Sequence, residues 1–309
     1  GNPNNFGATG GKPSHPELLD HLATEFVENG WSFKHLHRLI LTSDTWRQAA
    51  THPGIGEIRK TDPNNQLLAY FPARRLTAEE LRDSILRITG ELNPTLGGLP
   101  ARPDINREVA LSPRMIQFSL APAYQPNKTP AERNRRSIYA YRIRGLVDPL
   151  MEVFNKPNAD ASCEKRDAPS VTPQVFTLLN SEVLTNRSVA FALRLEQEAD
   201  TPAAQITHAY ELALLRKPTD AERDALLQHY EGMVAYHRKH APKPIEYPTE
   251  ITRSLVEEFS GEPFQFTELL DIYTDYTPDP QPVDQTPETR GLADVCLLLL
   301  NSNELMFVY

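Results

Sequence analysis

The chain has 309 residues, of which 39% are hydrophobic and 24% charged, and its formal net charge is -9, as in many globular proteins. The longest apolar run, residues 295–300, is far shorter than the roughly 20 residues of a membrane-spanning helix, and the acidic balance argues against general nucleic-acid binding. Two cysteines without a C-x-x-C pair exclude a disulfide scaffold, a zinc ribbon and thioether attachment of haem in this chain.

Capped helices are predicted for the N-terminal third. Residues 14–17 have the spacing of a capping box and predict a helix that ends at Gly30. Ser32 is expected to cap a second helix with apolar positions at helical spacing. Residues 77–80 form another capping box, and the helix that they open is expected to end near Gly90.

The middle of the chain is predicted to hold the β structure. Residues 93–128 are rich in proline and glycine and indicate a long connection with one short strand at 115–120. Residues 137–144 alternate in polarity and are rich in aromatic and β-branched side chains, so they predict the clearest strand, near Ile138–Ile143. A short strand at 305–309 is expected to pair with it.

The C-terminal half is predicted to be helical again. A cap and proline at 172–173 open a helical region that runs to about Glu198, with a break at 180–181. Caps at 201–202 and 219–222 start two further helices. A very apolar helix is expected from Gly291 to Asn303.

An acidic, proline-rich insertion precedes that last helix. Residues 241–289 contain 11 Asp/Glu, 2 Lys/Arg and eight prolines, so a continuous helix is excluded. Short helical segments are predicted at 250–259 and 267–273. The fold expected is therefore mainly α with a small β element. Residues 1–309 are expected to form one multi-helix domain that contains this insertion. Because the chain starts at Gly1 without a methionine, we expect it to be a piece of a longer protein.

Recognised catalytic and metal-binding motifs are missing from the sequence. There is no G-x-S-x-G and no H-E-x-x-H motif, and His237 and His240, which have helical spacing, lack a companion carboxylate. We therefore predict no metal site, assign no catalytic residue and do not favour an enzyme.

Arginines are concentrated around the predicted strand, with Tyr139 and Tyr141 between them. On a strand, Arg142 and Arg144 would project from one face and could bind a carboxylate, sulfate or phosphate. Alternatively, these arginines pair with acidic residues elsewhere in the fold. The residues proposed for an anion site are Arg136, Arg142, Arg144 and Arg166.

The two cysteines, Cys163 and Cys296, allow two interpretations. They would form a disulfide in an oxidising compartment, or they are buried, unreactive thiols.

Seven motifs occur in an order that resembles one family. They are N-F-G-A-T-G with S-H-P-E-L-L-D; G-W-S with L-H-R-L-I; R-R-L with L-R-D; R-S-I-Y; S-C; T-P-Q with L-L-N-S; and L-L-N-S-N-E. Together they resemble the C-terminal domain of unknown function of large planctomycete-type secreted proteins. The resemblance implies an extracytoplasmic location and, in the parent protein, a separate cytochrome c module that carries the haem. It implies no catalytic residue.

Two functions are therefore expected. The leading hypothesis is a non-catalytic structural or interaction domain of a secreted multidomain protein, whose partners are other domains of the same polypeptide. The alternative is a domain that binds or processes an anionic polysaccharide through the four arginines.

Overall fold

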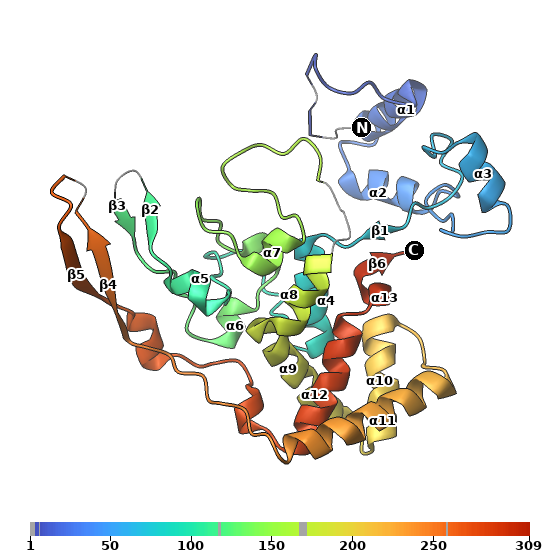
Figure 1. Cartoon of the computed structure of the whole chain (residues 1–309). Coiled ribbons are helices and arrows are strands. Elements are labelled where there is room, and N and C mark those ends of the chain that lie inside the picture. The colour runs from blue at the N-terminus through green and yellow to red at the C-terminus, as the bar shows by residue number, and fades with distance from the viewer. Residues whose placement is uncertain (1–3, 6, 117–118, 167–171, 258) are drawn as a thin grey trace. The chain divides into compact units, whose positions relative to one another are not determined.

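The computed structural model describes residues 4–5, 7–116, 119–166, 172–257 and 259–309 (Figure 1). The contacts within the chain divide it into two compact units. Unit 1 comprises Gly1–Arg75, Cys163–Asp167 and Phe307–Tyr309, and unit 2 comprises Leu76–Ser162 and Ala168–Met306.

Unit 1 contains three helices and one pair of short strands. They are α1 (Pro16–Glu28), α2 (Phe33–Leu41), α3 (Ile55–Thr61), and β1 (Arg74–Arg75) antiparallel to β6 (Phe307–Val308). Ser32 caps α2 as predicted, because its side chain accepts a hydrogen bond from the backbone N–H of His35. The capping box expected at residues 14–17 is wrong. The N-cap of α1 is His15, whose side chain makes no capping bond, and Ser14 bonds the His15 ring instead.

Unit 2 holds the larger core. Before the acidic stretch its elements are α4 (Ala78–Thr89), α5 (Arg107–Leu111), β2 (Arg114–Ile116), β3 (Ser119–Ala121), α6 (Pro130–Arg133), the 3₁₀ helix η1 (Ser137–Tyr139), α7 (Pro149–Val153), α8 (Thr172–Asn180), α9 (Glu182–Glu198), α10 (Pro202–Leu214) and α11 (Asp220–His237). After it starts, they are β4 (Glu250–Val256), β5 (Pro263–Leu269), η2 (Asp271–Asp275), η3 (Pro282–Asp284), α12 (Pro287–Leu300) and α13 (Asn303–Met306). The mainly α fold with small antiparallel β elements is therefore confirmed.

Local sequence placed several helix ends in unit 2 correctly, although the helix predicted from Gly291 to Asn303 runs from Pro287 to Leu300. The capping box of Thr77 and Glu80 opens α4, which ends at Gly90 in a left-handed conformation. The predicted break at 180–181 separates α8 from α9, where Ser181 accepts a hydrogen bond from Leu184. Caps of this kind depend only on neighbouring residues, so the sequence suffices to find them.

The apolar helix α12 lies at the centre of the helical core, packed against α9, α10 and α11 (Figure 1). Its close contact with α11 depends on Gly291. A Cβ atom at that position would lie 2.6 Å from Cγ2 of Val234 and 3.2 Å from the backbone O of Tyr230. The missing side chain therefore lets the two helices approach closely.

The strand predicted near Ile138–Ile143 is wrong. Residues Ser137–Tyr139 form η1, because both the backbone N–H and the hydroxyl of Ser137 donate to Asp83 at 2.7 Å. Ile138 is 76% exposed, and the segment contributes only isolated bridges, such as Ala101 with Ala140. The expected C-terminal strand exists as β6, but its partner is β1. A tertiary hydrogen bond thus overrides β propensity.

The short helices predicted at 250–259 and 267–273 are also wrong. The first segment is largely β4, which pairs with β5 in a long hairpin, and the second contains the end of β5 and the start of η2. The reason is tertiary. Arg253 is buried and pairs with Glu268 across the hairpin at 2.5 Å. It also donates to the backbone O of Leu111, which ties the hairpin to the end of α5. In place of the single strand predicted at 115–120 there are two short antiparallel strands, β2 and β3, and residues 117–118 of the prediction lie outside the described residues.

Replacing Gly291 by alanine should destabilise the protein. The added Cβ has to push α11 from α12, and overpacking of this kind costs about 1–3 kcal/mol. The matched control is Gly232→Ala on α11, where a Cβ meets nothing within 4 Å, so better helix propensity should stabilise by up to about 1 kcal/mol. Urea unfolding followed by circular dichroism measures the free energy of unfolding of both variants. Equal changes in the two variants would contradict the close approach of α11 and α12 at Gly291.

Candidate functional site

A network of buried charges holds together the loops of unit 2. Arg133 is fully buried, and its guanidinium donates to the backbone O atoms of Asn127, Lys128 and Thr277. It also lies 3.0 Å from a carboxylate oxygen of Asp104 and 3.1 Å from one of Asp279. One side chain thus joins segments that are far apart in the sequence.

Asp279 extends this network to α9. Its second oxygen accepts from Arg187, which also pairs with Glu91. Burial raises the pKa of Glu91, against the opposing effect of Arg187. The Arg133–Asp279–Arg187–Glu91 chain, called the ionic network below, neutralises its charges internally.

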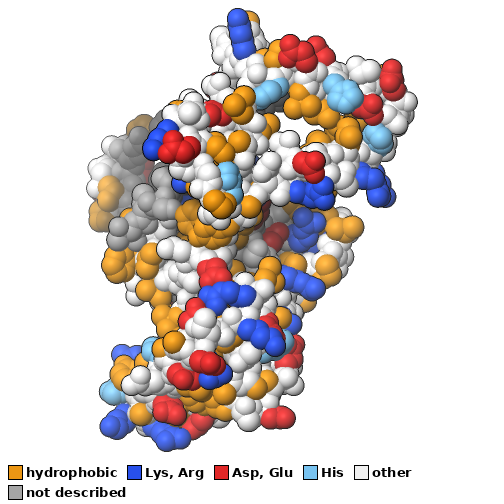
Figure 2. Space-filling model, turned by 90° about the vertical axis from the view of Figure 1, so that its right-hand side faces the viewer, with side chains coloured by type: hydrophobic (Ala, Val, Ile, Leu, Met, Phe, Trp, Pro, Cys, Tyr) orange, Lys and Arg blue, Asp and Glu red, His pale blue; other side chains and the backbone are white. Residues whose placement is uncertain are grey.

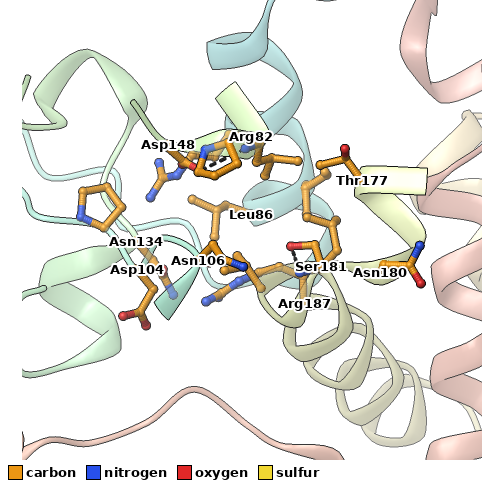
Figure 3. Close-up of a pocket in the computed structure, with 16 residues that line it drawn as sticks. Arg82, Leu86, Asp104, Asn106, Asn134, Asp148, Thr177, Asn180, Ser181 and Arg187 are labelled. Atoms are coloured by element: carbon orange, nitrogen blue, oxygen red, sulfur yellow. Dashed lines mark hydrogen bonds between the residues drawn. The ribbon is translucent and has the colours of Figure 1, made fainter. Parts of the chain in front are cut away.

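A pocket of about 230 Å³ lies beside this network (Figure 3). Helices α4, α7, α8 and α9 and the loop before α5 all contribute to its wall. The side chains that line it are Arg82, Ile85, Leu86, Pro103, Asp104, Asn106, Asn134, Asp148, Pro149, Leu150, Thr177, Asn180, Ser181, Val183, Leu184 and Arg187. It is called the central pocket below, and its lining combines seven apolar with nine polar or charged residues. Ligand sites likewise combine apolar surface with polar groups that orient the ligand.

The two cations of the central pocket are engaged by the protein. Arg82 donates to the backbone O atoms of Arg133 and Arg135 and to the hydroxyl of Ser137, at 2.8–3.2 Å. Burial lowers the pKa of Arg82. Because Arg187 belongs to the ionic network, both guanidinium groups act chiefly to position loops.

The two carboxylates of the central pocket differ from each other. Asp104 accepts from the Tyr276 hydroxyl at 2.6 Å and pairs with Arg133. Asp148 caps α7 by accepting from the N–H of Leu150 at 3.1 Å, and it forms no ion pair with any residue that the structure describes. Burial raises the pKa of both carboxyl groups.

One donor in the central pocket has no partner. Asn134, which follows α6, is only 3% exposed, and its side-chain Nδ2 makes no hydrogen bond within the described part of the chain. Buried polar groups in native proteins almost always have a partner. A molecule bound in the central pocket, or an ordered water, would supply the missing partner of Asn134.

A second, smaller pocket of about 60 Å³ adjoins the first, since Arg82, Pro103 and Asp148 line both. Arg142 and Lys156 also line it. Burial lowers the pKa of Lys156, which means that its charge is poorly solvated. We call it the basic pocket.

Three of the four arginines predicted to bind an anion, Arg136, Arg142 and Arg144, lie in unit 2, and each has its own surroundings. Arg136 lies 3.9 Å from Asp83, and Arg142 donates to the backbone O of Pro157 at the basic pocket. Arg144 is exposed, and Arg166 belongs to unit 1 while the others belong to unit 2. Anion binding by these residues stays a prediction.

Sequence reasoning missed the main residues of the central pocket. Asp148 caps α7 ahead of Pro149, and the same residue also lines the pocket. Nothing in the local sequence marks Arg82 or Asn134, because their roles depend on distant segments.

Both cysteines carry free thiols in the structure, Cys163 in unit 1 and Cys296 inside α12. Burial raises the pKa of the Cys296 thiol, which makes it unreactive. The disulfide between them stays a prediction.

His237 and His240 each contact another side chain of unit 2. His237 bonds Asp294 at 2.7 Å, while His240 stacks on Tyr236. Within the described residues, no set of three or more histidine, cysteine or acidic side chains is arranged to hold a metal ion. Nor does any helix there have the length and apolar character needed to cross a membrane.

Unit 1 exposes apolar side chains. Helices α1, α2 and α3 contain no buried residue, and Trp31 and Phe33 are each 66% exposed. Both rings contact Phe26, at centroid distances of 5.4 and 4.9 Å. Trp31 has a φ of +59°, a left-handed conformation that costs energy for a bulky residue. Hydrophobic side chains also reach the surface among charged ones on the face drawn in Figure 2.

The fold and its pocket define a mainly helical protein built around buried arginine–carboxylate pairs. The chain belongs to the PSD1 family of proteins of unknown function (DUF1553), whose model matches residues 1–230. This confirms the family that the ordered motifs resemble. No curated protein and no solved structure matches the chain.

Arg187→Met should destabilise unit 2 strongly. It leaves Glu91 and Asp279 buried without a cation from α9, and breaking a buried pair in this way costs about 3–5 kcal/mol. The control Arg136→Met removes a half-exposed arginine 3.9 Å from Asp83, for which a loss of about 0–1 kcal/mol is expected. Denaturant unfolding measures the free energy of unfolding of both variants. If Arg187→Met lowered it by no more than Arg136→Met does, the role assigned to the ionic network would be contradicted.

Proposed function

We propose that the chain is a non-catalytic interaction domain of a secreted multidomain protein, and that it associates with a cytochrome c module of the same polypeptide. The observation that carries this proposal is the apolar surface of unit 1. The amphipathic helices α1 and α2 have no buried residue, although they carry Phe26, Phe33 and several leucines.

Burial of this apolar surface against another domain would be energetically favourable. Fully burying one large apolar side chain contributes about 1.5–3 kcal/mol. The aromatic cluster of Phe26, Trp31 and Phe33 resembles the buried anchors that dominate binding energy at protein interfaces. The family resemblance supports the extracytoplasmic setting. Any haem belongs to the partner module, because this chain has no attachment motif.

Removing the aromatic cluster should weaken binding to the other domains. The chain and the remainder of its polypeptide are produced as separate proteins. Calorimetry measures the affinity between them, and haem absorbance shows whether the cytochrome module is present in the complex. We expect Trp31→Ser with Phe33→Ser to raise Kd at least tenfold, because a large desolvated contact is lost.

The matched control is Leu96→Ser with Leu99→Ser, which removes two exposed apolar side chains of unit 2. It should leave Kd unchanged. No measurable binding by the unaltered chain, or equal effects of the two double variants, would overturn the proposal.

A second candidate function, binding of an anionic glycan, is favoured by the basic pocket. Arg142 and Lys156 line it, and neither forms an ion pair within the described residues. A sulfate or carboxylate group there would compensate the poorly solvated charge of Lys156. Arg144 and Arg136 lie close in sequence and could extend the contact, and Arg166 remains part of this proposal.

Sulfated and uronic-acid oligosaccharides test this candidate. Millimolar ligand should raise Tm, because binding to the folded state stabilises it by mass action. Arg142→Ala with Lys156→Ala should remove the shift, whereas Arg47→Ala with Lys60→Ala, which alters surface residues that already have acidic partners, should retain it. No shift for the unaltered chain would contradict the candidate.

A further inference from the structure

The central pocket combines one free donor with one free acceptor. The donor is Nδ2 of Asn134, which has no partner within the described residues. The acceptor is the carboxylate of Asp148, which accepts from backbone N–H groups at the start of α7 and forms no ion pair in the described part of the chain. Both residues line the same pocket (Figure 3). A ligand that satisfies both has to accept a hydrogen bond as well as donate one.

This requirement excludes two classes of charged ligand. A carboxylate, sulfate or phosphate group accepts only, and it would face Asp104 and Asp148, while Arg82 and Arg187 are already engaged. An ammonium group donates only, so Asn134 would remain unpaired. A hydroxyl group does both.

The opposite wall of the pocket offers further hydroxyl partners. Ser181 accepts from the N–H of Leu184 at 3.4 Å, which leaves its own hydroxyl hydrogen available. Asn180 donates to the backbone O of Phe176 and keeps its side-chain oxygen as an acceptor. Thr177 adds another hydroxyl to this wall.

Apolar side chains cover the rest of the surface. Ile85, Leu86 and Leu184 are buried, and Pro103 and Pro149 contribute flat rings. The volume of about 230 Å³ lies just below the roughly 300–1,000 Å³ of drug-sized sites. A pocket of this volume, whose wall alternates between polar groups and C–H groups, matches the size and chemistry of a single ring that bears several hydroxyl groups.

We propose that the central pocket binds a neutral polyhydroxylated ring, such as a single sugar residue, with Asn134 and Asp148 as its polar anchors. This site uses neither the apolar residues of unit 1 nor Arg142 and Lys156 of the basic pocket, although Asp148 lines both pockets. It adds a small-molecule ligand to a domain whose family has no assigned one.

The test uses the whole chain and a panel of probes. Ligand-detected NMR and calorimetry are run with methyl glucoside, methyl galactoside, methyl mannoside and myo-inositol. Glucuronate and glucosamine serve as anionic and cationic analogues of the same ring. We expect at least one neutral probe to bind and the charged analogues to bind at least tenfold more weakly.

Variants then locate the site. Asn134→Leu should lower affinity at least tenfold while stability is kept or increased, because the unpaired buried donor is removed with similar volume. The control Asn186→Leu removes a second buried amide with an unpaired atom, which does not line the central pocket, and should leave affinity unchanged.

Three results would overturn the proposal. The first is that no neutral probe binds, which would mean that water alone fills the pocket. The second is that a neutral probe binds the Asn134→Leu variant as tightly as the unaltered chain. The third is that glucuronate or glucosamine binds more tightly than the neutral rings. Because thermal unfolding is measured for each variant, loss of binding through misfolding is recognised separately.

Discussion

The buried carboxylate of Asp279 is the interaction on which unit 2 depends. It lies between Arg133 and Arg187, so a charge that would be costly to bury alone is neutralised from two sides. Replacing a whole buried ion-pair network by well-packed apolar residues can be equally stable, whereas removing one partner is costly. We therefore attribute to the network a role in fixing the geometry of the loops. The guanidinium of Arg133 has several donors, and they determine where the loops at 127–128 and 277 lie.

The central pocket is a consequence of that arrangement. Arginines that hold loop carbonyls cannot collapse into the space beside them, since moving would leave buried hydrogen-bonding groups unpaired. Arg82 illustrates this, because it holds the segment at 133–137 and at the same time forms one side of the pocket. The polar groups that face the cavity are thereby positioned before any ligand arrives, and such preorganisation lowers the cost of binding.

The two units differ in how they use apolar side chains. Unit 2 buries them in the contacts of α12 with α9 and α11, where Gly291 allows an unusually close approach. In unit 1, helices α1 to α3 have apolar faces without a buried residue. The same kind of amphipathic sequence therefore builds a core in one unit and a surface suited to a partner in the other. Small-molecule binding and domain association would then involve different parts of one chain.

The sequence by itself determined several of the longer helices and some of their ends, because a cap such as Thr77 with Glu80 or Ser181 needs only its neighbours along the chain. It also identified the family through seven ordered motifs. Only the tertiary structure decided the fate of residues 137–139 and 250–269, where Asp83 and the Arg253–Glu268 pair select a 3₁₀ turn and a hairpin. The pocket residues Arg82, Asn134 and Asp148 came together for the same reason: contacts between distant segments, which local propensity does not encode, determine which polar groups are buried and which are left unpaired.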